Sequence, residues 1–303
     1  MLASLSDNTY KQYNSCIKAW IEYCKNHQYN FMKASVPIII HFLTGIFEKG
    51  ARYGTINSHK SALSLLLGDV LDDDRIKRFM KGVFRLRPTK PKYNMTWDPN
   101  IVLNYLAGKW PNVDLDLKIL SKKTLTLLAL VTAHRVQTLS LIKLSNISIQ
   151  SPTEITIKIP DLIKTSKPNS YQPYLRLPFY DSRPEICPAR CIQEYISKTQ
   201  TLRKNHDYLF ISYRRPHSKV TSQTLSHWIK DTLQCSGVNT DIFTAHSTRH
   251  AATSTANRSG VNIDIIRKTA GWSDSSSVFA KFYNKEIISV ANRFAESILD
   301  TCL

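Results

Sequence analysis

The sequence has few acidic residues for its length. Its 303 residues include 23 Asp and Glu against 41 Lys and Arg, a formal net charge of +18 at pH 7, and the pI is near 9.6. Glycine is also scarce, with 9 residues, and we find no internal repeat or low-complexity tract, which excludes a repeat architecture. A basic excess of this size favours a polyanionic partner, and composition favours nucleic acid over an anionic membrane face or a heparin-like chain.

Long hydrophobic runs are absent as well. The longest, around residues 36–43 and 125–133, are too short to span a bilayer. The opening stretch MLASLSDNTYKQY lacks the apolar core of a secretory signal. We therefore expect no membrane partner. The hydrophobic content of 42% nevertheless suits a protein with a real core and excludes a disordered chain.

Cysteine pairs that would suit a zinc site are missing. The six cysteines are scattered, as is typical of reduced thiols in an intracellular protein. Cys187 and Cys191 have no second Cys or His pair at a suitable spacing. There is also no paired Asp/Glu cluster to hold magnesium and no Gly-rich phosphate loop. We therefore predict no metal and no small-molecule cofactor.

The first part of the chain reads as four short helices. Capping residues and helical spacing of apolar side chains predict them from about Ser6, from near Ser35 with Pro37 in the first turn, over about 55–67 and over about 72–84. The segment RFMKGVFRLRPTKPKYNMTWDP follows, with three prolines and no acid before Asp98. We predict a helical domain over 1–87, a basic linker over 88–98 and a second domain over 99–303.

The basic segment has two compatible interpretations. It is a solvated charged tether, or it is a strap that lies along a phosphate backbone. The second interpretation gains from the overall positive charge. On it, the predicted DNA-binding residues are Lys60, Lys81, Arg85, Arg87, Lys90 and Lys92.

The second part combines helices with a small antiparallel sheet. Helices are expected over about 99–107, 115–133, 191–201, 222–235, 247–258 and 263–270, and a later one carries Tyr283. Alternating Ile155, Ile157 and Ile159 predict a strand that returns over 174–177, with Lys164 near the turn. Arg135 stands at the exit of the buried helix 115–133, either as a capping or salt-bridged residue or as an anion ligand. The expected fold is mainly α with a small antiparallel β-sheet.

The stretch AHSTRHAATS, residues 245–254, places His246, Arg249 and His250 within five positions and has no acid. Positions three and four apart share one helix face, so this segment presents a cationic spot. Guanidinium forks match phosphate oxygens, lysine and histidine transfer protons, and a tyrosine hydroxyl can act as nucleophile. The candidate set predicts phosphoryl transfer in which arginines take the place of a metal: Arg135, Lys164, His246, Arg249, Trp272 and Tyr283.

The order Arg, Lys on a hairpin, His-x-x-Arg, Gly-Trp and Tyr resembles the tyrosine recombinases, the phage-integrase-like family. The resemblance covers nearly the whole chain: residues 1–87 look like the family's core-binding (DNA-clamp) domain and 99–303 like its catalytic domain. HSTRH is similar to the family's most specific motif, and Gly271–Trp272 stands where members carry Gly-His or Gly-Trp. The chain departs from the pattern at Thr138, where many relatives have an acid, and in the slightly long interval from Trp272 to Tyr283.

The resemblance implies a mechanism for these positions. Tyr283 attacks a scissile phosphate, forms a 3′-phosphotyrosyl bond and releases a 5′-hydroxyl. Arg135 and Arg249 bind the non-bridging oxygens. Lys164 protonates the leaving oxygen and His246 assists proton removal from Tyr283. The indole N–H of Trp272 donates to a phosphate oxygen, and His250 gives structural support.

The resemblance also implies partners and a location. The partner is double-stranded DNA, and the protein assembles on it as a dimer or tetramer. The Lys164–Thr165–Ser166 element is most similar to recombinases of eukaryotic mobile elements, of the Crypton or DIRS kind, which implies the nucleus; otherwise the protein is cytoplasmic. A last helix from about residue 287 docks either on a neighbouring protomer or on its own core.

Three alternatives stay open. A zinc hydrolase is suggested by the i, i+4 spacing of His246 and His250, but HSTRH lacks the glutamate base of HExxH. A DNA-binding protein of recombinase ancestry would keep the fold and no longer exchange strands. A type IB topoisomerase shares the chemistry and relaxes supercoils without pairing two sites.

Overall fold

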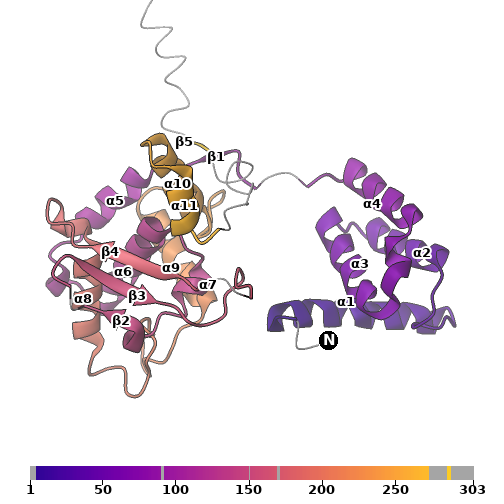
Figure 1. Cartoon of the computed structure of the whole chain (residues 1–303), viewed down its shortest axis with the longest axis horizontal. Helices are drawn as coiled ribbons and strands as arrows, with labels where there is room; N and C mark the ends of the chain where they lie inside the picture. The colour runs from indigo at the N-terminus through magenta and orange to yellow at the C-terminus, as the bar shows by residue number, and fades with distance from the viewer. Residues whose placement is uncertain (1–4, 90–91, 150, 169–170, 273–284, 288–303) are drawn as a thin grey trace, which may run out of the picture. The chain divides into compact units, whose positions relative to one another are not determined.

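The computed structural model describes residues 5–89, 92–149, 151–168, 171–272 and 285–287. The chain divides into two compact units, Met1–Lys92 and Tyr93–Leu303, and each is described by itself (Figure 1). Within the described part of the chain, no helix has both the length and the apolar character needed to cross a membrane.

The first unit consists of four helices: α1 (Asp7–Asn26), α2 (Val36–Glu48), α3 (Tyr53–Leu67) and α4 (Asp74–Leu86). The four predicted helices are confirmed. Ser6 caps α1, accepting from the backbone N–H of Thr9 at 3.3 Å, and a proline occupies the first turn of α2. Helix α4 begins two residues later than predicted because Asp73 provides its cap, through a hydrogen bond of 2.8 Å from the backbone N–H of Arg75.

The core of the first unit forms where α3 packs against α1, α2 and α4. Trp20 is fully buried, and its indole Nε1 donates to the carbonyl oxygen of Phe31 at 3.0 Å. Ile39, Leu43 and Ile56 are buried with it. Burial of such side chains contributes roughly 1.5–3 kcal/mol each, so the small unit has a core of its own.

The second unit is mainly helical and carries a small three-stranded antiparallel sheet (Figure 1). Strands β2 (Ile147–Ser148), β3 (Glu154–Lys158) and β4 (Tyr174–Pro178) pair antiparallel in that order, with Ile155 opposite Leu177. The predicted fold class is confirmed. The α-helices of this unit are α5 (Pro99–Ala107), α6 (Leu117–Thr132), α7 (Val136–Leu139), α8 (Pro188–Thr199), α9 (Ser222–Cys235), α10 (Ser247–Arg258) and α11 (Ile263–Thr269). Short 3₁₀ turns are η2 (Gly68–Asp72) in the first unit and η3 (Asn112–Asp114), η4 (Leu144–Asn146) and η5 (Pro184–Ile186) in the second.

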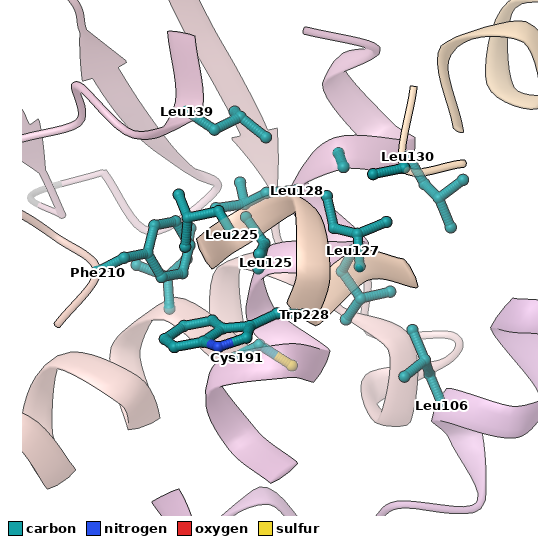
Figure 2. Close-up of a cluster of buried hydrophobic side chains, with 14 of the residues drawn as sticks. Leu106, Leu125, Leu127, Leu128, Leu130, Leu139, Cys191, Phe210, Leu225 and Trp228 are labelled. Carbon is teal, nitrogen blue, oxygen red and sulfur yellow. The ribbon is translucent and has the colours of Figure 1, made fainter. Parts of the chain in front are cut away.

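Helix α6 is the central element of the second unit. It packs against α8, α9 and α10 and buries Leu125, Leu127 and Leu128 completely (Figure 2). The nearly continuous apolar pattern of this segment therefore reflects burial on almost every side, as expected. The helix ends at Ala133, whose backbone is left-handed with φ 49°. This end places Arg135 at the N-terminus of the short helix α7.

The segment before α5 packs into the second unit, although residues 88–98 were predicted to be a linker. Tyr93 is 5% exposed and Trp97 2% exposed, both in the core of this unit. Strand β1 (Met95–Thr96) pairs in parallel with β5 (Glu286–Ile287). The prediction of a linker rested on the basic and proline-rich composition of this segment, and it did not take account of the two aromatic residues that are buried. Ile287, near the expected start of the last helix, lies in β5, and the rest of that helix falls outside the described residues.

Candidate active site

The HSTRH motif forms the first turn of α10. His246 is exposed at the N-terminal end of the helix, whereas the next four residues of the motif are buried. The rings of His246 and His250 lie 5.6 Å apart in an edge-to-face arrangement. Because the helix begins here, the motif presents one exposed imidazole above a buried guanidinium, Arg249.

Two aromatic residues from the predicted linker hold this turn. Trp97 Nε1 donates to Ser247 Oγ at 2.8 Å, and the hydroxyl of Tyr93 lies 2.7 Å from Thr244 Oγ1. The Tyr93 ring also contacts His250 edge-on, with centroids 5.2 Å apart. The motif is therefore anchored by side chains about 150 positions earlier in the sequence.

Arg249 is 1% exposed and bridges the ends of two other helices. Its Nη1 donates to the carbonyl oxygen of Ala133, at the end of α6, at 2.5 Å, and to that of Ala270, at the end of α11, at 3.1 Å. Its Cζ lies 4.8 Å from the ring centroid of Trp272. Carbonyl oxygens carry only partial charges, so these contacts orient the guanidinium without neutralising it themselves.

Arg135 and Arg249 lie close to the same residue, His134. Burial lowers the pKa of the His134 imidazole to about 3, and the positive charges of Arg249 and Arg135 act in the same direction. Arg135 itself is half-buried. The structure therefore brings together Arg135, Arg249 and Trp272, three of the predicted site residues.

Lys164 lies where it was predicted, on the connection between β3 and β4. Its turn is fixed by Ser166, whose Oγ accepts from the backbone N–H of Ile163 at 2.9 Å and donates to Gln172 Oε1 at 2.9 Å. The Lys164 side chain is exposed.

Tyr283 lies outside the described residues, but the chain is anchored on both sides of it. Trp272 packs beside Arg249, and the backbone N–H of Lys285 donates to Ser254 Oγ at 2.9 Å. Ser254 belongs to α10, the helix that also carries Arg249. Both ends of the intervening segment therefore attach next to that helix.

Two of the predicted DNA-binding lysines share a cleft in the first unit. Lys60 and Lys81 line a hollow of about 360 Å³ between α3 and α4, together with Lys77, which the sequence pattern did not single out. The other lining residues are Tyr53, Asn57, Met80 and Phe84. Arg85 and Lys92 are exposed, and Lys90 is outside the described residues.

Arg87 has an internal role instead of an exposed one. Its Nη1 donates to the carbonyl oxygens of Phe47 at 2.5 Å and Ala51 at 2.9 Å, and its Cζ lies 3.8 Å from the Phe47 ring centroid. These carbonyls lie at and just after the C-terminal end of α2, where backbone oxygens lack helical partners. Arg87 therefore joins the ends of α2 and α4, a long-range role that composition did not reveal.

The zinc alternative needs a third ligand beside His246 and His250. In the described ranges, no three His, Cys, Asp or Glu side chains gather as a metal-binding group. The supports of the site, which are Tyr93, Trp97 and His134, were not predicted from the sequence. Two aromatic residues within a basic, proline-rich segment were the available signal for the first two, and nothing in the sequence pattern marked His134.

The sequence matches the model of the phage integrase family over residues 115–287, which is more than half of the chain. The chain belongs to the phage integrase family. No match was found among curated proteins. The matched region spans the elements from α6 to β5 and so contains all six predicted catalytic positions of this phage integrase family member.

Solved structures of integrases and recombinases share the fold of this chain. A lambda integrase dimer bound to a COC′ core site is similar over 94% of this chain and 74% of its own, with a TM-score of 0.55 and 16% identity. The XerH recombinase in a pre-cleavage complex has a TM-score of 0.57 and 13% identity, over 86% and 70% of the two chains. The Tn1549 transposon integrase has a TM-score of 0.55 and 16% identity, over 88% and 86%. The fold is that of the tyrosine recombinases.

Proposed function

We propose that this protein is a site-specific DNA recombinase that cuts and rejoins DNA through a 3′-phosphotyrosyl intermediate at Tyr283. The observation that carries the proposal is the convergence of Arg135 and Arg249 on His134, beside Trp272. A pair of guanidiniums matches the two non-bridging oxygens of one phosphodiester. The phosphate of the substrate supplies the negative charge that complements this cationic site.

The arginines act on the transition state. As the Tyr283 oxygen adds to phosphorus and the bond to the 5′ oxygen breaks, charge grows on the non-bridging oxygens. Arg249, held by two carbonyls at the ends of α6 and α11, is already oriented and costs little reorganisation when that charge appears. Arg135, at the start of α7, offers the second guanidinium.

Proton transfers complete the reaction. The hydroxyl of Tyr283, with an ordinary pKa of about 10, must lose its proton as it attacks. His246, exposed at the start of α10, is the proposed acceptor, and Lys164 on its exposed turn is the proposed donor to the leaving 5′ oxygen. Trp272 is proposed to donate to a phosphate oxygen. Rejoining reverses these steps: the 5′-hydroxyl attacks the phosphotyrosyl bond and Tyr283 leaves. No outside energy is needed, because one phosphodiester is exchanged for another.

Chain connectivity supports Tyr283 as the nucleophile. Consecutive Cα atoms are about 3.8 Å apart, so residue 283 is tethered within about 8 Å of Lys285. The backbone of Lys285 is bonded to Ser254 on α10. Lys285, two positions after Tyr283, is thus attached to the helix that carries His246 and Arg249.

DNA binding and assembly are part of the proposal. The similar structures include a lambda integrase tetramer bound to a Holliday junction, as well as the dimer on its core site. We propose that this chain likewise binds double-stranded DNA and assembles on it as a dimer or tetramer. The chemistry needs no metal, because the two arginines offset the phosphate charge.

A nicked suicide duplex tests the chemistry. Duplexes that carry candidate element ends and a nick beside the cleavage site should trap a covalent protein–DNA species in the presence of EDTA, and Tyr283→Phe should abolish it. Binding without any adduct would favour a DNA-binding protein that no longer cuts. Relaxation of supercoiled DNA with no recombination between two cognate sites would favour a type IB topoisomerase. An adduct that persists in Tyr283→Phe would reject the nucleophile.

The finer placement rests on the Lys164–Ser166 element alone. We propose a recombinase of a eukaryotic mobile element, of the Crypton or DIRS kind, that acts in the nucleus. Mapping the covalent adducts on DNA carrying candidate element ends tests the first part, and imaging of the full chain in eukaryotic cells tests the second. Adducts spread evenly over unrelated DNA, or a protein retained in the cytoplasm, would reject this placement.

A further inference from the structure

His134 lies close to both arginines of the site. It directly precedes Arg135, and the residue before it, Ala133, provides the carbonyl oxygen that accepts from Arg249 Nη1 at 2.5 Å. The side chain of His134 is only 5% exposed. The short connection between α6 and α7 therefore carries the buried His134 ring and the Arg135 guanidinium. It also provides the Ala133 carbonyl that accepts from Arg249.

The His134 ring also packs against Gly271. A Cβ atom on Gly271 would lie 3.0 Å from His134 Cε1, closer than most real contacts of that kind, and 3.5 Å from Nδ1, an ordinary van der Waals distance. The backbone of Gly271 is left-handed, with φ +67°. Gly260, after α10, is also left-handed, with φ +82°, but nothing lies within 4 Å of its Cβ position. The ring contact, and not the backbone angle, distinguishes Gly271.

Gly271 lies between two residues that contact Arg249. The carbonyl oxygen of Ala270 accepts from Arg249 Nη1 at 3.1 Å, and the ring centroid of Trp272 lies 4.8 Å from Arg249 Cζ. A displacement of the Gly271 backbone would therefore move both neighbours of the guanidinium. The His134 ring touches this turn on one side and adjoins Arg135 on the other.

The ring fills the space without adding charge. Burial, together with the charges of Arg249 and Arg135, lowers the pKa of His134 to about 3, so the imidazole is neutral near pH 7. A third positive charge here would repel both arginines. A neutral planar ring fills the space beside Gly271 without adding that repulsion.

We propose that His134 is a positioning residue that sets the separation between Arg135 and the Arg249–Trp272 pair by packing against Gly271. The inference rests on the proposed function, since that separation decides whether both guanidiniums reach one phosphate. His134 itself takes no part in making or breaking bonds.

The first test is a size-complementation experiment with a matched control. Gly271→Ala and Gly260→Ala add the same methyl group at left-handed positions, but only the first meets the His134 ring. At saturating nicked DNA, we expect Gly271→Ala to form the covalent adduct at least tenfold more slowly than Gly260→Ala. Adding His134→Ala to Gly271→Ala should recover at least fivefold, because it makes room for the methyl group.

Two results of this experiment would overturn the proposal. One is equal adduct rates for the two glycine variants, and the other is a double variant as slow as Gly271→Ala alone. The glycine comparison requires no change at residue 134, so it decides the question even where His134→Ala does not fold. DNA affinity, measured alongside, should stay the same across the set.

The second test is independent of activity. The Nε–H resonances of Arg135 and Arg249 are followed by NMR in the full chain without DNA. We expect His134→Ala and Gly271→Ala to shift both resonances and Gly260→Ala to shift neither. An Arg249 resonance that does not move in His134→Ala would reject the positioning role. A wild-type protein that forms no adduct would reject the proposed function instead, while the spectra still decide the role of His134.

Discussion

Arg249 is buried almost completely, and its guanidinium donates to two backbone carbonyls and lies beside an aromatic ring. Placing a charge in a protein interior costs free energy, because the charge leaves water. Carbonyl oxygens carry only partial charges, so they orient the guanidinium and leave most of its positive charge in place. At the scale of the residue, the fold therefore bears the cost of burying the Arg249 guanidinium and fixes its orientation before an anion binds.

Substitution of Arg249 should separate chemistry from binding. Arg249→Ala is expected to lower the rate of adduct formation by about 10²–10³-fold or more, because it removes a transition-state donor. Most of the DNA affinity should remain, since other basic residues provide it. Single-turnover cleavage and DNA binding are measured in parallel, with Arg258→Ala, an exposed residue at the end of α10, as the control. Equal losses in both variants would contradict a specific role for Arg249.

His134 should make the second unit sensitive to acid. Its pKa is lowered in the folded state to about 3, mainly by burial and also by Arg249 and Arg135. Between about pH 6.5 and pH 3 the unfolded chain binds a proton that the folded chain does not, so stability falls as pH falls through this window. The slope from this one group is about 1.4 kcal/mol per pH unit at most.

Thermal unfolding from about pH 7 to about pH 4 checks this expectation, since this range lies within the window of the His134 transition. His134→Gln, which cannot titrate, should flatten the pH dependence of the melting temperature of the second unit. His206→Gln, at an exposed position, should leave it as in the wild type. A steep acid loss that persists in His134→Gln would assign the sensitivity to other groups.

At the scale of the element, helix ends decide the roles of neighbouring basic residues. Arg85 and Arg87 are two positions apart near the end of α4, and the basic composition of the segment does not distinguish their roles. Arg85 is exposed, whereas Arg87 turns inward to the carbonyls at the end of α2. The difference arises because the end of α2 has backbone oxygens to satisfy and lies within reach of only one of them.

Alanine variants should separate these two arginines. Arg87→Ala is expected to destabilise the first unit by about 1–3 kcal/mol, because the Ala51 carbonyl loses its donor and the Phe47 ring loses its contact with the guanidinium. Arg85→Ala should leave stability nearly unchanged and weaken DNA binding across sequences, with a salt slope reduced by about one unit. Denaturant unfolding and salt-dependent binding are measured for both. The opposite pattern would return Arg87 to the DNA-binding surface.

At the scale of the whole molecule, the net charge of +18 favours a polyanionic partner but does not show where it would bind. The cleft between α3 and α4 localises part of that charge, with three lysines around one hollow. One of them, Lys77, lies 3.1 Å from Asp74 in an exposed ion pair. Such pairs contribute about 0–1 kcal/mol and exchange readily for phosphate.

Neutralising the cleft should flatten the salt dependence of DNA binding. Replacing Lys60, Lys77 and Lys81 by Gln is expected to reduce the slope of log affinity against log salt by about 0.9 for each phosphate that these lysines neutralise. The matched control replaces Lys11, Lys18 and Lys25, three basic residues of α1, with the same change in net charge. Equal effects of the two triple variants would show that only total charge matters.

Elements with strong local signals could be predicted well. Helices α5, α9 and α10 have the predicted bounds, because caps such as Asp98 and Thr221 and the apolar spacing are local properties. Strands β1 and β5 were not predicted, because two-residue strands show no alternation. Their pairing joins residues about 190 positions apart.

The sequence by itself determined the mainly helical fold class and supplied the predictions of a polyanionic partner and of a set of site residues, since these follow from composition, local spacing and motif. Only the tertiary structure decided which basic side chains face inward, which aromatic residues hold the HSTRH turn, and that a buried, neutral histidine lies close to both arginines. These outcomes depend on contacts between distant segments. Whether a side chain is buried or exposed is a property of the packed chain, and no local pattern encodes it.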